Sequence, residues 1–412
     1  MKIDRRTFQS RLLLAQFLPL LRPLHAFAGT NGPDRTESRA ADFQHQHGPI
    51  TTDGQIALAN LDSARRRAWT RFYQDPLRSS TAEAVIECEQ LTLQFTGDVF
   101  ALDRLADLTS LLAREDDGSD RSPLLQAQVA TLSHRFADAD RHLADADRRG
   151  ADPDVVNRVR LGIAQARGSD PCRVLGQRRD AAVNSRRPED FVALGAVMAD
   201  LGDFADADRT YCTALEHCRD ISPFPPAWAC FQRGLLWGEQ VPEPNLDRAE
   251  HYYRSALAYL PGYCRARIHL AEIALARKQP ETAAELLEPV LASGDPEVPW
   301  RLAQAKALQG RTAESASLIE MARTGFELLC ERHLLAFADH GAAFSAAHEP
   351  NNRKGLDLAL TNVSNRPTIR AYEQAHSIAL TAHDRHTASD LLIAAKSRWG
   401  STKAFAVSSL AR

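Results

Sequence analysis

The hexapeptide FADADR occurs at Phe136–Arg141 and again at Phe204–Arg209, a separation of 68 residues. This separation is twice 34, and about 34 residues is the length of one repeat built from two antiparallel helices. If the chain is made of such units, the residues that pack one helix against the other should recur at the same places in units that lack the hexapeptide. The pair of hexapeptides therefore predicts a further pattern that the sequence itself can test.

In the second helix of each unit, an Ala should be followed by a large residue four positions later and a small one seven positions later. The pattern is found at Ala139, Leu143 and Ala146; Ala207, Tyr211 and Ala214; Ala249, Tyr253 and Ala256; and Ala283, Leu287 and Val290. Looser matches follow at Ser315, Ile319 and Ala322, and at Ala388, Leu392 and Ala395. The longer step from Ala207 to Ala249 contains the insertion EQVPEPN, and a long turn between helices costs little.

Helix-breaking residues fall where this arrangement needs turns. Gly202 follows ALGAVMADL and Gly310 follows RLAQAKALQ, and glycine readily adopts the left-handed backbone that ends a helix. Proline cannot continue a helix interior, and it punctuates the predicted loops at Pro153, Pro188, Pro261, Pro296 and Pro367.

These residues resemble the tetratricopeptide repeat (TPR) family over residues 79–412. The resemblance implies an all-α fold, a right-handed α-α superhelix of eight or nine helical hairpins. Residues 54–78 would form an N-terminal capping helix, and residues 326–363 are the least regular part of the pattern.

The composition fits a soluble α-helical protein and argues against a nucleic-acid partner. Hydrophobic residues make up 44% and charged residues 25% of the chain, and aromatic residues only 7%. The formal net charge is -3, with both signs interspersed, so no basic face for nucleic acid is predicted.

The first residues resemble an export signal. Residues 1–28 have a basic start, an apolar run from Leu12 to Leu21, and a small-residue cleavage pattern ending at Ala28. The apolar run is too short to span a bilayer, so no stable membrane span is expected in the mature form.

Arg5 and Arg6, followed by Thr-Phe, resemble the twin-arginine signal, although Asp4 and Gln9 depart from it. Ordinary secretion and a retained N-terminal helix remain alternatives. Residues 29–53 are polar and aperiodic and predict a disordered linker. The predicted location is periplasmic or secreted.

The TPR resemblance implies that the first helix of every hairpin lines a concave groove. The corresponding residues are Trp228, Phe231, Leu235, Arg265, Ile268, Glu272, Trp300 and Gln304. Aromatic residues beside charges are typical of peptide-binding hot spots. The alternative is that Trp228 and Trp300 fill gaps between neighbouring hairpins.

No catalytic residues and no cofactor are predicted. The sequence contains no nucleophile elbow, phosphate-binding loop, HExxH motif or dinucleotide fingerprint. His333, His340 and His348 lie near Glu331 and Asp339, but a polar helix surface is the favoured interpretation over a metal site, as it is over a metal-binding role for His45 and His47. Seven cysteines show no zinc-binding spacing, and a disulfide among Cys212, Cys218, Cys230 and Cys264 remains open.

The sequence therefore predicts an exported, non-enzymatic scaffold that binds a protein or peptide partner in its concave groove. The alternatives are a small-molecule or metal-binding envelope component, and a cytoplasmic regulatory TPR protein.

Overall fold

The computed structural model describes residues 48–115, 118–349 and 353–412. The predicted export signal, with Arg5, Arg6 and Ala28, and the arm histidines His45 and His47 lie outside the described residues.

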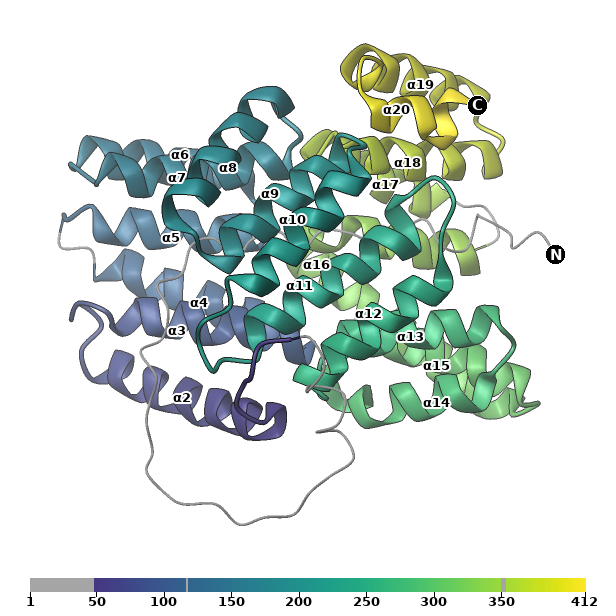
Figure 1. The fold of residues 1–412 in the computed structure, drawn as a ribbon, viewed down its shortest axis with the longest axis horizontal. Coiled ribbons are helices and arrows are strands. Elements are labelled where there is room, and N and C mark those ends of the chain that lie inside the picture. The colour runs from purple at the N-terminus through teal and green to yellow at the C-terminus, as the bar shows by residue number, and fades with distance from the viewer. Residues whose placement is uncertain (1–47, 116–117, 350–352) are drawn as a thin grey trace.

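Helices dominate every described part of the chain (Figure 1). The α-helices of the first half are α2 (Gly54–Gln74), α3 (Thr81–Leu91), α4 (Ala101–Arg114), α5 (Arg121–Leu132), α6 (Phe136–Arg148), α7 (Pro153–Ala166), α8 (Pro171–Ser185), α9 (Pro188–Asp200) and α10 (Phe204–Glu216). Those of the second half are α11 (Phe224–Leu235), α12 (Leu246–Tyr259), α13 (Cys264–Ala276), α14 (Pro280–Leu287), α15 (Glu297–Leu308), α16 (Thr312–His348), α17 (Arg353–Asn365), α18 (Ile369–Thr381), α19 (Arg385–Trp399) and α20 (Lys403–Val407). Two π-helical turns, η4 (Thr92–Thr96) and η5 (Leu236–Gln240), extend α3 and α11, and the 3₁₀ turns η6 (Glu288–Ser293) and η7 (Ser409–Ala411) follow α14 and α20.

Within the described residues, the helices form nine antiparallel pairs, which confirms the predicted all-α superhelix. The pairs are α3–α4, α5–α6, α7–α8, α9–α10, α11–α12, α13–α14, α15 with the first part of α16, the second part of α16 with α17, and α18–α19. The irregularity expected over residues 326–363 arises at His333, whose backbone is non-helical (φ −134°, ψ 47°). There the second helix of one hairpin runs into the first helix of the next without a loop.

Each hairpin is held by a large side chain of the second helix that lies against a small residue of the first. A Cβ atom on Gly195 would lie 2.5 Å from the Tyr211 ring, and one on Gly234 would lie 2.4 Å from the Tyr253 ring. Tyr211 is fully buried and Tyr253 nearly so. The absence of a glycine side chain therefore lets the helix axes approach closely.

The residues of the repeat pattern are buried where the sequence predicted them in the four best units. The buried set is Ala139, Leu143, Ala146, Ala207, Tyr211, Ala214, Ala249, Tyr253, Ala256, Ala283, Leu287 and Val290. In the two looser units the large buried residue lies one position earlier than expected, at Leu318 and Leu391, while Ile319 and Leu392 are only half-buried.

The N-terminal segment packs against the middle of the chain. The Thr52 N–H donates to the Ile221 carbonyl at 2.7 Å, and a Cβ on Gly54 would lie 2.3 Å from the Tyr259 carbonyl oxygen. Residues 48–53, which the sequence assigned to a disordered linker, are thus part of the folded body. Helix α2 packs along α3, as the predicted capping helix should.

The row of hairpins curls so far that its later hairpins lie against its first ones (Figure 1). The Phe95 ring of η4 lies 5.0 Å from Phe224 and 4.8 Å from Tyr263, centroid to centroid. Leu329 and Phe337 of α16 belong to the same buried cluster as the N-terminal hairpins. Part of the inner space of the superhelix is therefore filled by the chain itself.

Three turns spaced 34 residues apart make most of the later contacts. His134, Gly168 and Gly202 each join the first helix of a hairpin to the second, and each has a positive φ (55°, 55° and 89°). The Asn365 side chain donates to the His134 carbonyl at 3.0 Å. Arg398 donates to the Gly168 carbonyl at 3.1 Å.

The third turn receives the last helix of the chain. The Ala404 N–H donates to the Leu201 carbonyl at 3.1 Å, and Lys403 forms an ion pair with Asp203. A Cβ on Gly202 would lie 2.5 Å from the Ala404 backbone nitrogen. Docking of α20 thus requires glycine at position 202.

A glycine substitution tests this docking against a matched turn. Gly310 has a similar positive φ (77°), but no atom lies within 4 Å of its would-be Cβ. We expect Gly310→Ala to lower the free energy of unfolding by about 1 kcal/mol because of its backbone conformation. Gly202→Ala should lose about 1–3 kcal/mol more, since a methyl group is forced against α20. Urea unfolding measures both, and the extra loss should disappear when residues 401–412 are deleted; equal losses in the full chain would contradict the docking.

Candidate functional site

The predicted groove residues divide into a buried apolar set and a half-exposed polar set. Trp228, Phe231, Leu235, Ile268 and Trp300 are at most 3% exposed. Arg265, Glu272 and Gln304 are partly exposed. The structure thus corrects the expectation of an open apolar strip, because the first helices are covered by neighbouring helices on their apolar sides.

The buried aromatic residues hold successive hairpins together. Trp300 of α15 makes edge-to-face contacts with Phe326 and Phe344 of α16, at centroid distances of 5.9 and 5.3 Å. Phe231 of α11 contacts Tyr253 of its own hairpin at 5.6 Å and Tyr263 of the next at 4.9 Å. These contacts match the gap-filling alternative that the sequence left open for the tryptophans.

The polar groove residues belong to a network that the structure extends across three consecutive first helices. We call Glu239, His269, Glu272, Arg301 and Gln304 the inner polar network. His269 Nδ1 lies 3.0 Å from Glu239 Oε1 and 3.2 Å from Glu272 Oε2. Arg301 Nε lies 2.9 Å from Glu272 Oε1, and Arg301 also donates to Gln304 Oε1 at 3.2 Å. Charges on α13, α15 and η5 are thus joined on one face.

The inner polar network places a protonated histidine between two carboxylates. Burial lowers the pKa of His269, but Glu239 and Glu272 outweigh burial and raise it to about 9. The His269 ring is stacked on Tyr253 at 5.2 Å with an interplanar angle of 9°, which fixes its orientation. The ligand atoms of Glu239, His269 and Glu272 all lie within 4.8 Å of one another, close enough to hold one metal ion.

Three members of this network were missed by the sequence analysis. His269 and Glu272 are three residues apart in α13 and share a helix face, a spacing that could have drawn attention to both. Glu239 gave no such signal, because it lies in a π-helical turn whose wider winding changes the direction of its side chains.

A second buried polar group lies where the curled row closes. Arg366 is fully buried and donates to Asp339 Oδ2 at 2.9 Å and to Asn362 Oδ1 at 3.0 Å. It also lies 3.1 Å from His134 Nδ1, which must accept because a guanidinium only donates. Since removing one partner of a buried ion pair costs about 3–5 kcal/mol, this group holds the later hairpins against the second hairpin.

The histidines of α16 do not form the polar surface that the sequence predicted. His333 pairs with Asp103 of α4 at 2.8 Å, whereas His340 is buried and pairs with Glu297 at 2.9 Å. Burial lowers the pKa of His340, but Asp339 and Glu297 raise it overall. His348 lies against the rings of Trp300 and Phe344. The kink at His333 breaks the shared helix face on which the metal alternative depended.

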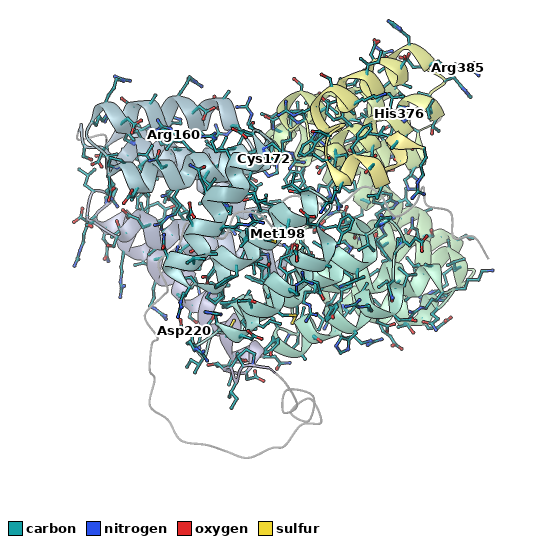
Figure 2. The ribbon with its side chains drawn as sticks, turned by 45° about the horizontal axis from the view of Figure 1, so that its top comes forward. Arg160, Cys172, Met198, Asp220, His376 and Arg385 are labelled. Atoms are coloured by element: carbon teal, nitrogen blue, oxygen red, sulfur yellow. The ribbon has the colours of Figure 1, made fainter. Side chains whose placement is uncertain are left out.

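All seven cysteines are free in this structure, including the four for which the sequence left a disulfide open. Cys172 lies at the surface at the start of α8 (Figure 2). Burial raises the pKa of the Cys218 and Cys230 thiols to about 12, so both remain protonated near neutral pH. Thiols in this state are poor nucleophiles.

Comparison with known proteins places a repeat family on part of the chain. Residues 243–307 match the tetratricopeptide repeat family, and this segment contains α12, α13, α14 and most of α15. None of the curated protein sequences matches the chain significantly.

Several solved structures share the helical fold at low sequence identity. Yeast Tom70 is 13% identical with a TM-score of 0.43, and the match covers 83% of this chain and 82% of Tom70. A human IFIT1 dimer with m7Gppp-AAAA is 13% identical with a TM-score of 0.40, covering 89% of this chain and 88% of that one. A tetratricopeptide repeat protein from Parabacteroides merdae is 15% identical with a TM-score of 0.34, covering 71% of this chain and 96% of that one. Among the described helices, none has the length and apolar character needed to cross a membrane.

The charge on His269 predicts a pH-dependent stability. Because its pKa rises from about 6.5 in the unfolded chain to about 9 in the folded one, its stabilising contribution is complete below pH 6.5 and is lost as pH rises to 9. We therefore expect the free energy of unfolding of the wild type, relative to His269→Gln, to fall between pH 6.5 and 9.5.

Urea unfolding at the two pH values, with EDTA present so that trace metal does not compete with protons, measures this difference. His386→Gln, which alters an exposed histidine of α19, serves as the control. A pH-independent difference between the wild type and His269→Gln would contradict the interpretation.

Proposed function

We propose that this chain is an exported scaffold without catalytic activity, which binds a protein or peptide partner on the inner face of its TPR-type solenoid. The observation that carries the proposal is the inner polar network, whose half-exposed members project from consecutive first helices of a hairpin row. A solenoid offers an extended surface made by successive repeats, and such surfaces are used for binding.

The mode of binding differs from the one expected for an apolar groove. The large apolar side chains of the first helices are occupied in packing, so a partner would meet Arg265, Glu272 and Gln304 instead. These side chains offer a guanidinium, a carboxylate and an amide. We therefore infer that the partner binds mainly through hydrogen bonds and charge, with a recognition segment that carries both donors and acceptors.

The absence of catalysis in this proposal has two supports. The sequence lacks the catalytic motifs named above. The buried cysteines, such as Cys218 and Cys230, have pKa values of about 12 and are held inside hairpin packing. Both observations favour a scaffold over an enzyme with a thiol nucleophile.

Site-directed crosslinking tests the inner face directly. We expect a photo-crosslinking amino acid at Gln304, on the inner side of α15, to capture a discrete partner in the native cells. The matched control is the same amino acid at Glu285, an exposed residue of the neighbouring helix α14. Capture from position 285 but not from position 304 would place the partner on the outer face and reject the proposed binding mode.

Export rests on residues 1–28 and has its own test. If the twin-arginine resemblance is correct, Arg5→Lys with Arg6→Lys should retain the protein inside the cell, because that pathway requires the arginine pair. Cell fractionation followed by immunoblotting measures the distribution, and Arg11→Lys is the control, since this arginine lies outside the pair. Unchanged export of the double variant would reject the twin-arginine route, and retention of the wild type in the cytoplasm would reject export itself.

A further inference from the structure

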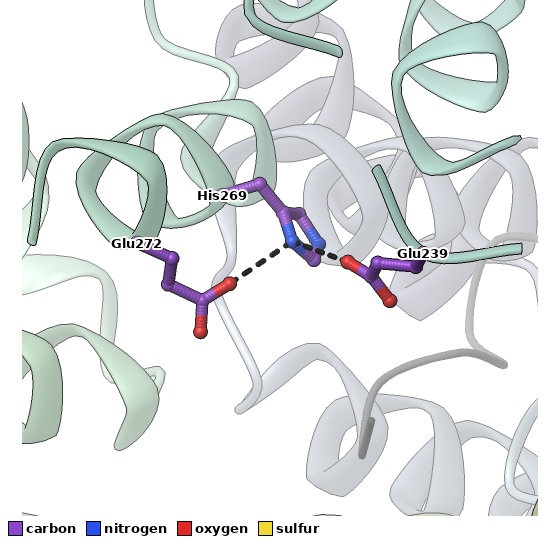
Figure 3. A group of neighbouring side chains, drawn as sticks. All are labelled: Glu239, His269 and Glu272. Carbon is purple, nitrogen blue, oxygen red and sulfur yellow. Dashed lines mark ion pairs between the residues drawn. The ribbon is translucent and has the colours of Figure 1, made fainter. Parts of the chain in front are cut away.

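Three metal-binding side chains converge inside the inner polar network (Figure 3). Figure 3 shows Glu239 and Glu272 approaching the same nitrogen of His269 from opposite sides. His269 and Glu272 lie one helical turn apart on α13, and Glu239 comes from η5. One imidazole nitrogen and two carboxylate oxygens within 4.8 Å of one another make a compact set of ligand atoms.

The chain builds the position of Glu239 by an unusual local structure. The end of α11 widens into η5, and Gly238 within this turn lies against the second helix, where its Cβ would be 3.1 Å from the Ala249 Cβ. A π-helical turn of this kind is rare and is frequently found at functional sites. Its effect here is to carry a carboxylate from the fifth hairpin to a histidine of the sixth.

The neighbouring residues hold two of the ligands in place. Tyr253 stacks on the His269 ring. Arg301 contacts Glu272 at Oε1, which leaves the other oxygen of this carboxylate, Oε2, directed at His269. Partners that orient the ligand side chains are a regular feature of metal sites.

Glu239 supplies an independent indication that something is bound there. Its side chain is only 4% exposed, and its Oε2 atom makes no hydrogen bond within the described part of the chain. A buried carboxylate oxygen without a partner is costly, and a coordinated cation is one of the few groups that can satisfy it. The imidazole ligand disfavours Ca²⁺ and Mg²⁺, which prefer oxygen atoms alone.

We propose that Glu239, His269 and Glu272 bind a divalent first-row transition metal, with Zn²⁺ as the probe, through one nitrogen and two carboxylate ligands. Three protein ligands leave room for a fourth from water or from another molecule. The ion would join the fifth and sixth hairpins and neutralise the carboxylates of the inner face. This role is independent of partner binding, and it is measurable on the purified protein alone.

Zinc titration of the metal-free protein tests the site. The full chain, stripped with EDTA, should bind Zn²⁺ in isothermal titration calorimetry, and Glu239→Gln and Glu272→Gln should each weaken this binding by more than about 100-fold. Such a loss is expected because changing even an outer partner of a metal site costs 10- to 100-fold. The control is Glu297→Gln, which alters a buried glutamate that contacts a different histidine, His340.

A second readout keeps the test decisive if one variant folds poorly. Added Zn²⁺ should raise the melting temperature of the wild type and of Glu297→Gln, because a ligand that binds only the folded state stabilises it. It should leave Glu272→Gln unchanged, and circular dichroism checks that each variant is folded. Equal zinc affinity and equal thermal shifts in the wild type and both network variants would overturn the proposal, as would the absence of zinc binding to the wild type.

Discussion

The packing of a large ring from one helix into the space left by a glycine on the other is the contact on which the rest of this structure depends. Tyr211 lies against Gly195, and Tyr253 against Gly234, so two hairpins separated along the chain are built by the same contact. Because both rings are buried, each helix pair has little freedom to change its crossing geometry. Repetition of one hairpin geometry then gives the row a constant curvature, and curvature determines what the inner face can contain.

That curvature brings the later hairpins against the first ones. The turns at His134, Gly168 and Gly202 recur every 34 residues with a left-handed backbone, and they meet α17, α19 and α20 in order. The ion pair between Arg366 and Asp339 lies inside this closure and is buried there. Polar groups so far apart in sequence are satisfied only when the row is curled, so they favour this one arrangement over an open one.

The first helices consequently carry two different surfaces. Their apolar sides are buried by neighbouring helices, and Trp300 and Phe231 show how aromatic rings join adjacent hairpins. Their remaining side carries the inner polar network, in which His269 lies between two carboxylates. A protein that buries its aromatic residues in packing has mainly charge and hydrogen bonds left for recognition, and the proposed partner and the proposed metal both follow from that division.

The sequence alone determined the repeat, the helices and the residues that pack each hairpin, because these depend on contacts between positions four to about forty residues apart. Ala207, Tyr211 and Ala214 could be assigned from spacing, since helical periodicity decides which side chains face the partner helix. Sequence spacing also gave Glu272 and Gln304 as inner residues. It did not give the burial of Trp228 or the pairing of His333 with Asp103, which lie 230 residues apart in the latter case. Only the tertiary structure decided these features, because they depend on how far nine small hairpin rotations accumulate, and a kink at His333 or a π-helical turn before Val241 changes that sum without any sign in the repeat pattern.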